Sequence, residues 1–239
     1  MRDLPPPLPP AERTVGQLVG ETMRAYGANF WRALPLGVPL ALADQFSIGQ
    51  SQTSQVLVFW AAGPLIVAAY VRACSIVHDV RPTRAAVLVA MLIYLPFPVL
   101  RALAFLPGVA WFALIGLAVP AAMIERRGFR DSLVCGRQLG LADYVHALGS
   151  LAALVIVVGV GDEALTAILR SQGDNSQRVA LCIADLVLSP LLYLGGALLY
   201  LDQAARVGSR RPNRRSRDAD LHPSDDADAA RRADAQVES

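Results

Sequence analysis

The chain contains no lysine, so all 22 of its basic residues are arginines. Cysteine and histidine occur only three times each, and no Cys-x-x-Cys or His-x-Cys spacing is present. These absences exclude a disulfide framework and a metal knuckle, and we expect no metal and no cofactor. The net charge of +2 provides no overall basic field, so we expect no nucleic-acid partner. The lack of lysine beside abundant arginine, alanine, glycine and proline is typical of a GC-rich bacterial genome.

Catalytic motifs are absent as well. The sequence has no HExxH motif, no paired carboxylates and no Ser/His arrangement at a workable spacing. Its histidines, His78, His146 and His222, have no acidic cluster in register with them. We therefore expect that the protein is not an enzyme.

Long apolar stretches are what the chain has in place of such motifs. Hydrophobic residues make up 54% of it, and the mean hydropathy is +0.40 even with a strongly polar C-terminal tail included. Stretches of about 17 to 25 apolar residues are long enough to cross a bilayer as a helix. The sequence predicts an all-α polytopic membrane helical bundle with six transmembrane helices, over residues 31–48, 56–77, 85–106, 108–124, 144–160 and 179–201.

Two of these helices come from a single apolar block, residues 85–124, whose only charge is Arg101. As one helix the block would be about 60 Å long, roughly twice the hydrocarbon thickness of a bilayer. It must therefore fold back, and Pro107-Gly108 near its middle has the composition of a turn. Pro96 and Pro98 should kink the first of the two helices.

The weakest of the six stretches is 31–48, because Pro35 and Pro39 interrupt it and Asp44 lies near its far end. Its length alone would also allow a re-entrant segment. The charge pattern favours a true span, since four arginines lie before or at the start of the stretch and residues 49–55 carry no charge.

Arginines occupy alternate gaps between the apolar stretches. Four lie before or at the start of the first stretch, two lie in the 79–85 loop, four in the 125–143 loop and eight after Leu201. Only Arg170 and Arg178 fall in gaps on the other side, and Arg72 and Arg101 fall within spans. Because basic loops stay in the cytoplasm, the pattern predicts a multi-pass protein of the bacterial cytoplasmic membrane with both termini cytoplasmic.

The N-terminal region divides into two parts. Residues 1–12 read as a proline-rich disordered arm, and residues 13–30 as an amphipathic helix that begins with a capping box at Thr14 and Gln17. Its apolar face, from Val15 to Phe30 and including Met23, suits the inner membrane interface. The alternative is a helix that packs on the bundle as an ordinary lid.

The C-terminal region, residues 208–239, is predicted to be a disordered charged tail because it has almost no apolar residues to bury. An arginine cluster beside the last span either serves as a topology anchor or contacts anionic lipid headgroups. The residues that would make such headgroup contacts are Arg206, Arg210, Arg211, Arg214 and Arg215.

Three ionisable residues lie within the predicted spans at a similar depth: Asp44, Arg101 and Asp185. Charges inside a bilayer are costly, so such residues usually have a partner or a function. We hypothesise that Arg101 pairs with Asp185, Asp44 or both and forms a polar focus in the outer half of the bundle. The focus is either a substrate or proton site or a purely structural pair.

Three segments of the chain carry a family resemblance. They are residues 13–30, which begin Arg-Thr-Val-Gly-Gln-Leu, residues 122–139, which contain Glu-Arg-Arg-Gly-Phe-Arg-Asp-Ser-Leu, and residues 199–206, Leu-Tyr-Leu-Asp-Gln-Ala-Ala-Arg. Over about residues 13–208 the chain resembles the membrane domain found beside some glycerophosphoryl diester phosphodiesterases. The resemblance implies an acidic residue at the end of the fourth helix, here Glu125, followed by a short interfacial helix over 129–141. It implies no catalytic residue, because the hydrolytic chemistry needs a separate soluble domain.

Taken together, these features predict a non-enzymatic membrane scaffold or accessory module. The expected partners are the lipid bilayer, anionic lipid headgroups and other membrane proteins. The alternative is a small transporter or lipid-handling protein that uses the polar focus, a possibility weakened by the lack of a detectable internal repeat.

Overall fold

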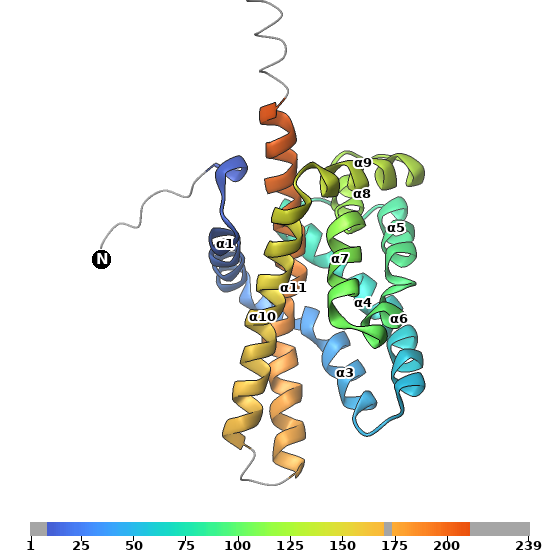
Figure 1. Cartoon of the computed structure of the whole chain (residues 1–239), viewed down its shortest axis with the longest axis vertical. Coiled ribbons are helices and arrows are strands. Elements are labelled where there is room, and N and C mark those ends of the chain that lie inside the picture. The colour runs from blue at the N-terminus through green and yellow to red at the C-terminus, as the bar shows by residue number, and fades with distance from the viewer. Residues whose placement is uncertain (1–8, 170–173, 211–239) are drawn as a thin grey trace, which may run out of the picture.

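The computed structural model describes residues 9–169 and 174–210, and every regular element in those two ranges is a helix. In chain order the elements are η1 (Pro10–Glu12), α1 (Val15–Ala28), α2 (Phe30–Ala33), η2 (Leu34–Gly37), α3 (Val38–Ser47), α4 (Gln52–His78), α5 (Arg84–Tyr94), α6 (Phe97–Leu103), α7 (Phe105–Ile115), α8 (Ala118–Ile124), α9 (Phe129–Ala142), α10 (Tyr144–Leu169) and α11 (Asp174–Arg210). The last two helices, α10 and α11, run antiparallel and side by side. α1 lies on one side of this pair, and α3 to α9 lie on the other (Figure 1).

Within the described ranges, five helices are long and apolar enough to cross a membrane, which indicates a multi-pass membrane protein. They cover Gln52–His78, Arg84–Leu103, Leu106–Ile124, Tyr144–Ile168 and Arg178–Gly208. The expected all-helical membrane bundle is thus present. The sixth expected span, 31–48, is divided among α2, η2 and α3, none of which reaches the necessary length alone.

Prolines explain why this first segment is broken. Pro35 lies in the first turn of η2 and Pro39 in the first turn of α3, where a missing backbone N–H leaves no hydrogen bond unmade. Between them, Gly37 packs directly on α11: an added Cβ would lie 2.2 Å from the carbonyl oxygen of Leu186. The close approach fixes where α3 lies relative to the last helix.

The apolar block 85–124 folds back on itself, but earlier than the sequence suggests. The turn lies at Ala104, whose backbone is extended between α6 and α7, and not at Pro107-Gly108. Pro107 instead occupies the first turn of α7, which tolerates proline because its N–H needs no partner there. The expected kink is present, since α5 ends at Tyr94 and α6 begins at Phe97.

The last two helices are longer than the spans predicted for them. The fifth predicted span ends at residue 160, which leaves Asp162 and Glu163 in the following loop, but α10 continues to Leu169 and contains both. Strong helix formers such as Ala164 and Leu165 follow the two acids and carry the helix onward. Asp162 is therefore on a helix that faces the bundle, while Glu163 is exposed.

The helix over residues 15–28 begins with the predicted capping box. The backbone N–H of Gln17 donates to the Thr14 hydroxyl oxygen, and the backbone N–H of Thr14 donates to the Gln17 side-chain oxygen. α1 packs against α10 and α11 through Leu18 and Thr22, which are fully buried. Met23, on the same predicted apolar face as Leu18, is 47% exposed in the protein alone.

The predicted disordered regions fall mostly outside the described residues. Residues 1–8 of the arm and 211–239 of the tail lie there, including Arg211, Arg214 and Arg215. The described residues of the predicted arm and tail are helical. Pro10–Glu12 forms a 3-10 helix, and α11 continues through Gly208 to Arg210.

Candidate functional site

A cavity of about 300 Å³ lies within the helical bundle and is lined by residues of α3, α4, α5, α6, α7, α8, α10 and α11. One region of its wall is apolar and includes Val119, Leu151 and Val158. Another region carries four ionisable side chains, Asp44, Arg101, Asp162 and Asp185. The cavity therefore combines an apolar body with a charged part, as ligand pockets commonly do.

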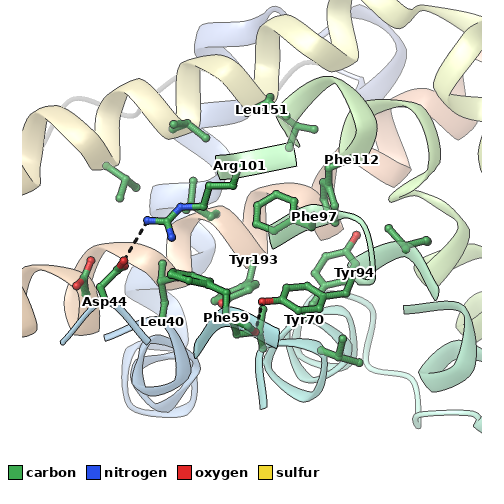
Figure 2. A pocket seen from close by; sticks show the side chains of 18 of the residues that line it. Leu40, Asp44, Phe59, Tyr70, Tyr94, Phe97, Arg101, Phe112, Leu151 and Tyr193 are labelled. Atoms are coloured by element: carbon green, nitrogen blue, oxygen red, sulfur yellow. Dashed lines mark hydrogen bonds and ion pairs between the residues drawn. The ribbon is translucent and has the colours of Figure 1, made fainter. Parts of the chain in front are cut away.

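Arg101 and Asp44 face each other across the charged part of the cavity (Figure 2). Nη2 of Arg101 donates to Oδ1 of Asp44 at 3.0 Å, and the guanidinium carbon lies 4.0 Å from the centre of the Phe59 ring. The short helix α6 presents Arg101, and α3 presents Asp44 from the opposite wall. The arginine is thus neutralised by one carboxylate and stacked on one aromatic face.

Asp185 lines the same cavity but has no comparable partner. The residue is only 4% exposed, and its Oδ2 atom is buried without a hydrogen-bond partner among the described residues. Asp162 contributes a further carboxylate, and its Oδ1 is also buried without a hydrogen-bond partner within residues 9–169 and 174–210. An ionised carboxylate in an apolar site is costly unless a cation or hydrogen-bond donors neutralise it.

Aromatic residues form much of the remaining wall. The Tyr94 hydroxyl donates to the carbonyl oxygen of Phe59 at 2.9 Å, and the Tyr70 hydroxyl to that of Gly116 at 3.2 Å. Both bonds hold rings in place against the cavity, and Figure 2 shows the one between Tyr94 and Phe59. The aromatic lining consists of Phe59, Tyr70, Tyr94, Phe97, Phe112 and Tyr193.

All three polar residues singled out in the spans therefore line one cavity, and the structure pairs Arg101 with Asp44 and not with Asp185. Sequence reasoning missed Asp162 because it was assigned to a loop. The signal that could have placed it is its spacing from Val155, Val158 and Gly159, which lie one or two helical turns away on the same face of α10.

A second polar cluster connects Arg13, just before α1, to the last helix, α11. Arg13 forms an ion pair with Asp202, in which Nη1 lies 3.1 Å from Oδ1, and the Asp202 side chain is fully buried. Arg206 bonds Asp143 at 2.8 Å and also donates to the backbone oxygen of Arg13 at 2.7 Å. Arg206, predicted to contact lipid headgroups, is thus held by protein groups here, and the side chain of Arg210 lies outside the described residues.

A third cluster surrounds Glu125, which caps the C-terminus of α8 just before α9 begins. Tyr200 donates to its Oε1 at 2.6 Å, Arg127 forms an ion pair with its Oε2, and the Cys135 thiol lies 3.8 Å away. Burial works to raise the pKa of Glu125, but the hydrogen bonds from Tyr200 and Arg127 outweigh it and the pKa is lowered. Burial and the nearby Glu125 charge raise the pKa of the Cys135 thiol.

No group of three or more histidine, cysteine or acidic side chains is arranged to hold a metal ion within residues 9–169 and 174–210. In comparisons with known proteins, the chain matches no family model, no curated protein and no solved structure. The resemblance to the phosphodiesterase-associated membrane domain therefore stays a sequence-based expectation.

Proposed function

We propose that this chain is an integral membrane protein that binds an amphipathic molecule within its helical bundle, as a small transporter or lipid-handling protein. The observation that carries the proposal is the central cavity, which has an apolar body and a charged wall at Asp44, Arg101, Asp162 and Asp185. A cavity of about 300 Å³ is in the size range of small-molecule sites. Non-enzymatic scaffolding, predicted from the sequence, remains the second candidate, and the cavity favours ligand binding over it.

The proposed setting is the bacterial cytoplasmic membrane, with six spans and both termini in the cytoplasm. α2, η2 and α3 follow one another without a break from Phe30 to Ser47. At 1.5 Å per α-helical and 2.0 Å per 3-10 residue, this kinked path is roughly 29 Å long, close to the hydrocarbon thickness of a bilayer. Together with the arginine pattern, this length supports the crossing of residues 31–48 as a sixth span.

Lipid contacts belong to the same proposal. In this view α1 lies near the cytoplasmic interface while packing on α10 and α11, and arginines beyond the last span contact anionic headgroups. The exposed Trp31, at 81% exposure, follows α1 and suits an interfacial position. Partner membrane proteins remain part of the scaffold alternative.

Native mass spectrometry of the full chain released from detergent tests ligand binding. We expect the wild type to retain small amphipathic molecules extracted from the membrane. Val158→Trp should greatly reduce their retention, because Val158 is 5% exposed and lines the cavity. Val160→Trp is the matched control, since Val160 is on the same helix but 63% exposed. Equal retention by the two variants would refute binding in the cavity.

A further inference from the structure

We infer that the cavity binds a compact apolar molecule carrying one protonated amine, with Asp185 as the counter-ion of the ammonium group. This inference rests on the proposed function, because it specifies the ligand of the same cavity. Three features of the wall support it: an unmatched negative charge, aromatic faces around it and a limited volume.

The charge balance is the first feature. Among the described lining residues there are three carboxylates, Asp44, Asp162 and Asp185, and a single arginine. Arg101 is already bonded to Asp44, while the buried Oδ2 of Asp185 has no hydrogen-bond partner in the described part of the chain. A cation at Asp185 would supply both the missing charge and the missing hydrogen-bond donors.

The aromatic faces are the second feature. Ammonium groups are attracted to the faces of aromatic rings, and cages of such rings recognise them in many proteins. Tyr94 and Tyr193 line the cavity together with Asp185, and the guanidinium of Arg101 already lies over the Phe59 ring. The same wall thus shows a cation in contact with an aromatic face.

The chemistry of the wall also selects against other cations. Hard metal ions such as Ca²⁺ and Mg²⁺ require about six or more oxygen ligands. Beside the carboxylates, the cavity presents mainly aliphatic and aromatic side chains, among them Ile66, Val119 and Leu192. Such a surface favours a cation that is attached to an apolar body.

The volume sets the size of that body. At about 300 Å³, the cavity is at the lower limit for drug-sized ligands and is too small for a lipid with two full acyl chains. The ligand is therefore a lipophilic amine with a short chain or a small ring system. The ammonium group either belongs to a free amine or forms the head of a single-chain lipid.

Photoaffinity labelling of the purified full chain in nanodiscs tests the inference. Three diazirine probes with the same alkyl chain carry an amine, an alcohol or a carboxylate, and labelled peptides are identified by mass spectrometry. We expect the amine probe to label the cavity-lining peptides about tenfold more than the alcohol probe. Octylamine and hexanoyl lysophosphatidylethanolamine, both with short chains, serve as competitors, and the stronger one identifies a free amine or a lipid head as the source.

Variants assign the preference to one residue. Asp185→Asn should reduce labelling by the amine probe to the level of the alcohol, whereas Asp131→Asn, an exposed change on α9, should leave it unchanged. If Asp185→Asn does not fold, labelling of the wild type is sufficient as a test. Equal labelling by the amine and the alcohol probes would already overturn the inference. Preferred labelling by the carboxylate overturns it too and points to Arg101 as the headgroup contact.

The same experiment separates this inference from the proposed function. If the three probes label the cavity equally and Val158→Trp abolishes all of that labelling, ligand binding stands and only the amine specificity fails. If labelling is insensitive to Val158→Trp, the cavity does not bind the probes and the proposed function fails with it.

Discussion

Arg101 and Asp44 are 57 positions apart in the sequence and are joined by an ion pair of 3.0 Å across the central cavity. Their side chains are 37% and 21% exposed in the protein alone. The pair links the short helix α6 to α3, the part of the bundle that proline residues interrupt most. It therefore stabilises two elements that have little helical length of their own.

Breaking this pair is expected to destabilise the protein. Arg101→Ala should lower the free energy of unfolding by about 1 to 2 kcal/mol, because it leaves Asp44 beside two other carboxylates without a counter-ion. Arg24→Ala is the control: Arg24 pairs with Glu21 on the exposed side of α1, and the change should be nearly neutral. Thermal unfolding in detergent measures both. The charge swap Arg101→Asp with Asp44→Arg should be more stable than either single change, and failure to recover would contradict the pairing.

Gly37 is expected to be intolerant of any side chain. A Cβ there would lie 2.2 Å from the Leu186 carbonyl oxygen, so Gly37→Ala must push η2 away from α11 and should cost about 1 to 3 kcal/mol. Gly20→Ala is the matched control, because nothing lies within 4 Å of the added Cβ and alanine favours the helix. A midpoint of thermal unfolding that falls for the first variant and not for the second is the expected result. Equal midpoints would show that the two elements are not in close contact.

Tyr200→Phe should change how stability depends on pH. The Tyr200 hydroxyl helps to hold the pKa of Glu125 below its ordinary value of 4.5, and a lowered pKa stabilises the fold at pH values above that range. The variant should therefore be less stable than the wild type by about 1 kcal/mol near neutral pH. The difference should shrink as the pH falls through the lowered pKa and Glu125 takes up a proton. Unfolding curves across acidic and neutral pH check this, and a difference that is constant with pH would contradict it.

The ion pair between Arg13 and Asp202 is expected to hold α1 against α11. Arg13→Gln removes the ion pair with the fully buried Asp202 and should let α1 separate from α11 more often. We expect amide hydrogen exchange in α1 to accelerate by about tenfold, with little change in α4 and α5. Arg24→Gln, on the exposed side of the same helix, serves as the control. Equal exchange in all three proteins would mean that Arg13 does not hold α1 in place.

Topology can be decided by labelling from one side of the membrane. With the three native cysteines replaced, Gln50→Cys and Arg81→Cys are tested with a membrane-impermeant thiol reagent in whole spheroplasts. Six spans predict that Gln50→Cys is labelled from outside and that Arg81→Cys and Ala11→Cys are labelled only after lysis. If Gln50→Cys and Ala11→Cys behave alike, residues 31–48 do not cross the membrane.

Much of the fold could be predicted from the sequence because hydrophobic length and turn residues act locally. The start of α1 at Thr14 was predicted from the capping-box spacing of Thr14 and Gln17, which the structure contains. The chain reversal in 85–124 was also predictable, but its position was not, because Pro107 is acceptable both in a turn and in the first turn of a helix.

The candidate site was predictable only in part. An unusual charge inside an apolar stretch identifies Asp44, Arg101 and Asp185 without knowledge of the fold. Which carboxylate meets Arg101 depends on where the kinks place α3 and α6, and sequence spacing does not contain that information. Asp162 was missed because its neighbour Glu163 is also acidic, and two adjacent acids resemble a loop. In α10 only Asp162 lines the cavity, and Glu163 is exposed.

The pairing of Arg101 with Asp44 also bears on the order in which the protein is made. Both residues lie in the first half of the chain, so both are synthesised before α10 and α11, and neither of those helices contributes an atom to the ion pair. Asp162 and Asp185 reach the bundle last, when its one cavity arginine is already engaged. Among the described lining residues, these two acids therefore join a cavity whose arginine already has a partner.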